Sequence, residues 1–168
     1  MSSTTFSVGM DGPTPSQIFK DRRIFAEDYL PPRILHRDHE IKAIRKVLAD
    51  MDRNARPENI LSIGTYGTGK TVVYRTIGKE LLSARVPFCY VPCHKENTRY
   101  RIIRSMLSQL GMPIKVGFPG DFYDNALEEV LSNYRFVVAC YDEIDKFTGR
   151  KNAESFEFFY TLSRTLHN

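Results

Sequence analysis

The chain has 168 residues, 42% hydrophobic and 26% charged, so it can bury one core and is neither fibrous nor wholly disordered. Its longest apolar run, 136–141, is far shorter than the roughly 20 residues of a membrane span. The first twelve residues lack the apolar stretch of a signal peptide, so we expect a cytoplasmic protein without a membrane partner. The net charge of +4 permits a nucleic-acid partner without requiring one.

The cysteine content favours a reducing compartment. Cys89 and Cys140 lie inside apolar, strand-like runs, where cysteine serves as a small buried hydrophobe, and the third cysteine, Cys93, leaves an odd count. Cys93 and His94 could contribute to a metal site, but the chain has no second CxxC or HxxxH cluster to complete four ligands.

The amino-terminal third combines an irregular arm with one helix. Residues 1–17 are rich in Ser, Thr, Gly and Pro and are predicted to be disordered. In "YLPPRIL", Pro31 and Pro32 exclude a helix interior and favour an extended segment. Between residues 38 and 51 apolar side chains recur at helical spacing, which predicts an amphipathic helix: Ile41, Ile44, Leu48 and Met51.

From there the predicted elements alternate between strands and helices. In chain order they are a buried strand over 60–63, a helix from Lys70, a strand over 87–93, a helix from about Thr98 to Gly111, a helix from near Asp121 as N-cap, an apolar strand ending in acids at 142–143, and a helix over 154–166. This alternation predicts an α/β fold with a parallel sheet covered by helices on both faces.

The stretch "LSIGTYGTGKT" satisfies the GxxxxGK[ST] phosphate-loop pattern between a predicted strand and a predicted helix. Its glycines let successive backbone N–H groups point at phosphate oxygens, Lys70 would reach the β and γ phosphates, and the Thr71 hydroxyl would ligate Mg²⁺. The motif therefore predicts ATP or ADP as the cofactor, with Mg²⁺, held by residues 64–72: Gly64, Thr65, Tyr66, Gly67, Thr68, Gly69, Lys70, Thr71 and Val72.

A second motif, "VVACYDEID", is predicted to place Asp142 at the carboxyl end of the sheet as a Mg²⁺ residue. The adjacent Glu143 can orient and deprotonate a water, so Glu143 and Lys70 are the candidate catalytic residues. A glutamate directly after the aspartate favours ATP hydrolysis over phosphoryl transfer to a metabolite. The alternative is that both acids only lie at a solvent edge. Asp145 and Lys146 are predicted to be surface residues of the following loop.

Four blocks in order resemble the AAA+ replication initiators of archaea, relatives of the eukaryotic origin-recognition and cell-division-control ATPases. The blocks are "IFKDRRIFAEDYLPPRILHRDHEI", "ENILSIGTYGTGKT", "YVPCHKENTRYRIIRSML", and "VVACYDEIDKF" followed by "FFYTLSRTL". The resemblance implies a P-loop NTPase of AAA+ type and, as partners, origin DNA, other initiator protomers and the replicative helicase. It also implies a nucleoid-associated location in the cytoplasm.

The same resemblance implies that Tyr29, Leu30, Pro31 and Leu35 wall the adenine, with Arg37 beside the nucleotide. The alternative is that these residues only cap the core. Residues 107–127 are similar to an insertion that touches origin DNA in the family, but the nearby cations are equally compatible with a solvated surface: Arg101, Arg104 and Lys115.

The chain departs from the family at two places. Tyr66 is bulky where the family usually has a smaller residue or a proline. Family members also continue past the position of Asn168 into a sensor strand, a lid and a winged-helix domain. We therefore expect residues 18–168 to form an AAA+ domain truncated before these parts, an ATP-binding portion with little hydrolysis alone.

The sensor strand of the family lies between the strands that carry Gly64 and Asp142. Without it, both neighbours would expose backbone N–H and C=O groups unless they close up on each other. Two other functions stay open: a non-catalytic regulatory module that binds another initiator, and a different AAA+ ATPase such as a clamp-loader-like or transposition-helper protein.

Overall fold

The computed structural model describes residues 20–26, 29–51, 58–112, 117, 119–148 and 157–159. They fall into two compact units, Met1–Arg33 and Ile34–Asn168. In the first unit, a short 3₁₀ helix, η1 (Arg22–Phe25), begins after Asp21, whose carboxylate accepts from the Arg23 N–H at 2.9 Å. The predicted disordered arm, residues 1–17, lies outside the described residues.

Two helices of the second unit confirm the predicted amphipathic segments. Helix α2 (Asp38–Leu48) runs into the 3₁₀ turn η2 (Ala49–Met51), and helix α3 (Lys70–Ser83) begins at the predicted lysine. The two helices share a small core of Ile44, Val73 and Ile77. An ion pair at 2.7 Å between Arg45 and Glu80 adds a polar link between them.

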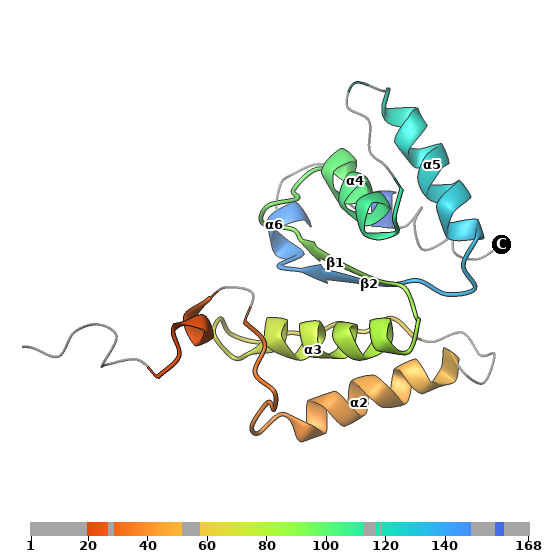
Figure 1. The fold of residues 1–168 in the computed structure, drawn as a ribbon. Helices are drawn as coiled ribbons and strands as arrows, with labels where there is room; N and C mark the ends of the chain where they lie inside the picture. Colours follow the sequence, from red (N-terminus) through yellow and green to blue (C-terminus); the bar gives the residue numbers. More distant parts are fainter. Residues whose placement is uncertain are drawn as a thin grey trace, which may run out of the picture. The chain divides into compact units, whose positions relative to one another are not determined.

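The sheet consists of two parallel strands in the described residues, β1 (Phe88–Pro92) and β2 (Val138–Asp142), with Tyr90 opposite Cys140. Helix α3 packs on one face and α4 (Arg99–Gln109) on the other, with α5 (Gly120–Ser132) against α4 (Figure 1). The main core fills the space between the sheet, α4 and α5. The predicted parallel sheet with helices on both faces is confirmed.

Helix ends mostly follow their sequence signals. The Thr98 hydroxyl accepts from the Arg101 N–H at 3.3 Å, and Gly111 takes φ +84° just after α4, as predicted. Helix α5, however, has Pro119 as its N-cap, and Asp121 lies in the first turn. This prediction was wrong by two residues because the proline already sets the extended backbone that precedes a helix.

The segment after β2 is a helical turn, α6 (Asp145–Thr148), where a loop was predicted. Asp145 and Lys146 are nevertheless exposed, as predicted. In the predicted helix over 154–166, residues 157–159 are helical, and the rest lie outside the described residues.

The prediction of a buried strand over 60–63 was wrong. Residues 58–65 are not part of any strand, and Leu61 and Ile63 are 75% and 88% exposed. A single extended segment cannot bury its backbone without a hydrogen-bonded neighbour, and the described residues provide none beside it. Two outcomes were expected for this segment: exposure of its backbone, or pairing with the strand that carries Asp142. Exposure is observed.

Within the described chain, no helix combines the length and the apolar character needed to cross a membrane.

Candidate functional site

The phosphate-loop motif and the acidic end of β2 lie together where α3 begins. The loop reaches α3 through two glycines in the left-handed backbone region, Gly67 at φ +74° and Gly69 at φ +82°. A Cβ at Gly69 would meet no atom within 4 Å, so the backbone conformation, rather than a lack of space, calls for glycine there. The first turn of α3 then carries Lys70, Thr71 and Val72.

The Lys70 ammonium lies inside the loop. Its Nζ donates to the Gly64 and Thr65 carbonyl oxygens at 2.7 Å each and lies 3.4 Å from Thr68 Oγ1. The Thr68 hydroxyl in turn donates to the Thr65 carbonyl at 2.9 Å. Because a charged acceptor binds an ammonium more strongly than a neutral carbonyl does, a phosphate oxygen can displace either carbonyl contact.

The two residues predicted to hold Mg²⁺ are in direct contact. Thr71 Oγ1 donates to Asp142 Oδ2 at 2.7 Å, and the Glu143 N–H donates to the other carboxylate oxygen, Oδ1, at 3.1 Å. Mg²⁺ prefers oxygen ligands and is usually held by one or two protein groups together with phosphates and water. A hydroxyl and a carboxylate at one point, beside an ammonium suited to phosphate, therefore fit this ion.

The Asp142 carboxylate has a further partner that was not predicted from the sequence. The Tyr90 hydroxyl donates to Asp142 Oδ2 at 2.6 Å, from the neighbouring strand β1. Tyr90 is the first residue of the block "YVPCHKENTRYRIIRSML", but neither the phosphate-loop motif nor the acidic motif around Asp142 contains it. The register between β1 and β2 determines this contact, and register cannot be read from either strand alone.

Glu143 stands directly after β2 in a left-handed conformation, φ +52°. Its Oε2 atom lies 3.5 Å from Nδ1 of His94, and both side chains are more than one-third exposed. In the sequence, His94 is a candidate only for a metal ligand, beside Cys93. The contact could have been anticipated, because His94 follows β1 and Glu143 follows β2, and the carboxyl ends of neighbouring parallel strands meet at one edge.

Of the residues just before α2 in the second unit, Arg37 contacts the loop. Arg37 donates through Nη2 to the Thr68 carbonyl at 2.5 Å and pairs through Nη1 with Glu40 at 2.5 Å. Leu35 is 66% exposed. Tyr29 and Leu30 belong to the first compact unit.

Tyr66 projects from the loop and is largely exposed. The Lys146 ammonium lies 5.9 Å from the centre of its ring, and the interaction with Tyr66 raises the pKa of Lys146. The bulky side chain is thus accommodated outside the loop, next to the first turn of α6.

The candidate DNA-contacting residues are divided between surface and core. Arg101 and Arg104 are exposed on α4, whereas Lys115 lies outside the described residues. The two ends of the predicted insertion, Leu107 and Leu127, are buried in the main core, where α4 packs on α5.

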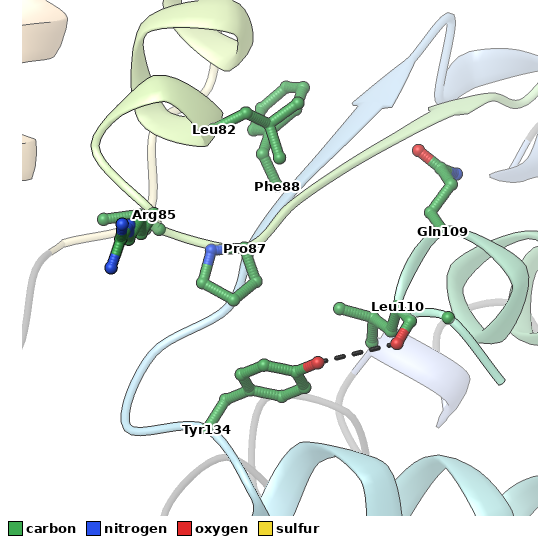
Figure 2. Close-up of a pocket in the computed structure, with 9 residues that line it drawn as sticks. Leu82, Arg85, Pro87, Phe88, Gln109, Leu110 and Tyr134 are labelled. Carbon is green, nitrogen blue, oxygen red and sulfur yellow. Dashed lines mark hydrogen bonds between the residues drawn. The ribbon is translucent and has the colours of Figure 1, made fainter.

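An open pocket of about 330 Å³ lies at the other end of β1, away from the phosphate loop. Figure 2 shows Leu82, Phe88 and Tyr134 around it, with the Tyr134 hydroxyl donating to the Leu110 carbonyl at 3.5 Å. None of the predicted nucleotide-binding residues lines this pocket.

The chain is similar to a known family model and to several known proteins. The family model described as "AAA domain" matches residues 53–168. The ORC1-type DNA replication protein 1 of Sulfurisphaera tokodaii is 32% identical over 156 residues, which cover 89% of this chain and 38% of that protein. The ORC1-type DNA replication protein of Pyrococcus abyssi is 30% identical over 160 residues, covering 88% of this chain and 38% of that protein. The chain thus spans less than two-fifths of the length of these relatives.

Two solved structures are similar over 87% of this chain. Aeropyrum pernix ORC1 in complex with DNA has a TM-score of 0.74 at 27% identity, and 40% of that chain is covered. A. pernix ORC2, solved as ADPNP-ADP complexes, has a TM-score of 0.68 at 26% identity, with 41% covered. The matched family model, the relatives and the shared fold show that the chain belongs to the AAA domain family, among the archaeal ORC1-type DNA replication proteins.

Proposed function

We propose that this chain binds Mg-ATP or Mg-ADP and is the nucleotide-binding portion of an origin-binding DNA replication initiator. The observation that carries the proposal is the 2.7 Å hydrogen bond between Thr71 Oγ1 and Asp142 Oδ2. It joins the loop hydroxyl and the strand carboxylate at one point, next to Lys70. A glycine-rich loop, an ammonium and two oxygen ligands are the parts that a Mg-nucleotide site requires.

Each part has a separate task in binding. The backbone N–H groups of residues 64–69 and the amino terminus of α3 face the phosphates, and Lys70 exchanges its carbonyl partners for phosphate oxygens. Thr71 and Asp142 hold the ion, which neutralises phosphate charge and orients the β and γ groups when bound. Arg37, already bonded to the loop at Thr68, lies beside the nucleotide, and Leu35 contributes to the wall around the base.

Glu143 is the proposed base for a water that attacks the γ phosphate. Fast hydrolysis needs the base, the water and the charge-stabilising groups in place together. Of these parts we assign only Glu143 and Lys70 within the described residues, and the Glu143 carboxylate lies beside His94 at 3.5 Å. We therefore expect measurable binding and slow turnover.

The proposed cellular role follows from the similar proteins. The A. pernix ORC1 structure contains DNA, and the A. pernix ORC2 structure contains ADPNP and ADP. By analogy, a protein carrying this domain would act at origin DNA together with other initiator protomers and the replicative helicase.

Thermal unfolding of the purified chain tests nucleotide binding. A ligand that binds only the native state stabilises it by RT ln(1 + [L]/Kd), about 2.7 kcal/mol at a hundredfold excess over Kd. We expect Mg-ADP to raise the unfolding temperature of the wild type and to leave Lys70→Ala unshifted. Chelation of Mg²⁺ with EDTA should reduce the wild-type shift.

A matched control is Lys79→Ala, which removes an exposed lysine from the same helix, nine positions after Lys70. This variant should respond to Mg-ADP as the wild type does. An unshifted wild type, or equal shifts in the wild type and Lys70→Ala, would refute nucleotide binding at this loop.

A further inference from the structure

Tyr90, on β1, contacts Asp142, one of the two residues proposed to hold Mg²⁺. Its neighbour across the sheet is Cys140, two residues before Asp142, so the ring extends diagonally along the sheet toward the Asp142 carboxylate. Its hydroxyl donates to Asp142 Oδ2 at 2.6 Å, the same oxygen that accepts from Thr71 at 2.7 Å. Both hydroxyls therefore meet on one carboxylate oxygen.

Other residues hold both the ring and the backbone of Tyr90. The Arg75 guanidinium, from α3, lies 4.6 Å from the centre of the ring. On the strand, the Tyr90 N–H donates to Gln109 Oε1 at 2.8 Å, and Gln109 Nε2 donates to the Tyr90 carbonyl at 3.0 Å. The hydroxyl is consequently held at a defined place relative to β2.

The Tyr90 hydroxyl is suited to a donor role. A phenol carries its proton in neutral solution, so this hydroxyl has a hydrogen to donate to the Asp142 carboxylate.

The direction of the Thr71 hydrogen bond explains why the orientation of the Asp142 carboxylate matters for metal binding. Because Thr71 donates its hydrogen to Asp142, its remaining lone pairs are free for a metal ion. That arrangement lasts only while the carboxylate faces the hydroxyl. The Glu143 N–H holds Oδ1, and Tyr90 supplies the second fixed donor on Oδ2.

We propose that Tyr90 is a positioning residue for the Mg²⁺ that accompanies the nucleotide: its hydroxyl fixes the Asp142 carboxylate in the orientation that keeps Thr71 ready to bind the metal. The proposal rests on the proposed binding of Mg-nucleotide. Outer partners of this kind typically change metal affinity 10–100-fold when they are removed.

The test compares Tyr90→Phe with Tyr141→Phe by calorimetric titration of ADP, at a series of MgCl₂ concentrations and in EDTA. Both variants remove one hydroxyl from the same strand pair. The Tyr141 hydroxyl, however, lies 3.4 Å from Met106 Sδ, in the core beside α4. We expect Tyr90→Phe to raise, about tenfold, the MgCl₂ concentration at which half of the magnesium-dependent gain in ADP affinity is reached. The affinity for ADP in EDTA should stay unchanged. Tyr141→Phe should leave both quantities unchanged.

A double-variant cycle with Asp142→Asn gives a second readout. If Tyr90 acts through Asp142, Tyr90→Phe should have no further effect on the magnesium dependence once Asp142 is replaced. Additive effects of the two substitutions would overturn the proposal.

The outcomes separate this proposal from the proposed function. A wild type that binds no ADP overturns both. If the wild type binds ADP in a magnesium-dependent way and Tyr90→Phe shows the same magnesium dependence, only the positioning role is overturned. A Tyr90→Phe variant that loses unfolding temperature and ADP affinity in EDTA in parallel would reveal a merely structural role and would also overturn it.

Discussion

Gly78 lies where helix α3 approaches strand β1 most closely. A Cβ at this position would lie 2.2 Å from Phe88 Cε1 and 2.5 Å from its Cδ1, distances that side chains do not tolerate. Glycine inside a helix costs about 0.5–1 kcal/mol relative to alanine. The close approach of α3 to the sheet, which also brings Thr71 to Asp142, gives the physical reason for glycine here.

Gly78→Ala should therefore destabilise the chain by about 1–3 kcal/mol, the range for overpacking a core, in spite of its better helix propensity. Gly120→Ala is the matched control, because a Cβ there meets no atom within 4 Å, and we expect a change within about 0.5 kcal/mol. Urea unfolding of both variants measures the difference. A Gly78→Ala variant as stable as the wild type would mean that the Phe88 ring moves aside freely.

At the scale of elements, the two edges of the sheet differ. On the outer edge of β1, the Gln109 side chain takes the place of a strand by bonding both the N–H and the C=O of Tyr90. On β2, the bonds at Val138 and Asp142 point to β1, so Ala139 and Tyr141 direct their backbone groups to the opposite edge. No strand of the described chain pairs with that edge. One edge is therefore covered, and the other presents backbone groups that can pair with a strand.

The exposure of residues 60–63 predicts an unusual tolerance to substitution. Ile63→Thr should change the free energy of unfolding by less than about 0.5 kcal/mol, because Ile63 is already in contact with water. Val91→Thr, which places a hydroxyl at a fully buried position of β1, should cost about 1–3 kcal/mol. Urea unfolding of the two variants measures both changes in the free energy of unfolding. Equal losses would indicate that residues 60–63 form the buried strand that the sequence predicted.

At the scale of the whole molecule, local patterns predicted most of the fold. Spacing of apolar residues placed α2, α3 and α4, and the phosphate-loop motif located Lys70 and Thr71 because that motif is itself local. The strand over 60–63 could not be judged in this way, since an apolar run becomes a strand only beside a partner. Tyr90 was missed for a related reason: its role depends on the register of two strands far apart in sequence.

The burial of the thiols gives a test of the folded chain as a unit. Burial raises the pKa of Cys89 to about 11 and that of Cys93 and Cys140 to about 12. A raised pKa keeps each sulfur protonated at pH 8, and only the thiolate attacks a disulfide reagent. Ellman's reagent should thus react slowly with the native chain and rapidly with three thiols in denaturant. Rapid reaction of all three without denaturant would contradict this core.

The left-handed backbone at Glu143 has a consequence for how such a domain evolves. A non-glycine residue in this region costs roughly 1–2 kcal/mol, and φ at Glu143 is +52°. Selection for folding alone would favour glycine at this position, whereas the proposed role of Glu143 in activating a water requires a carboxylate. That proposed role and stability make opposite demands on a single residue, and a lineage that did not use the role could relieve the strain with one substitution.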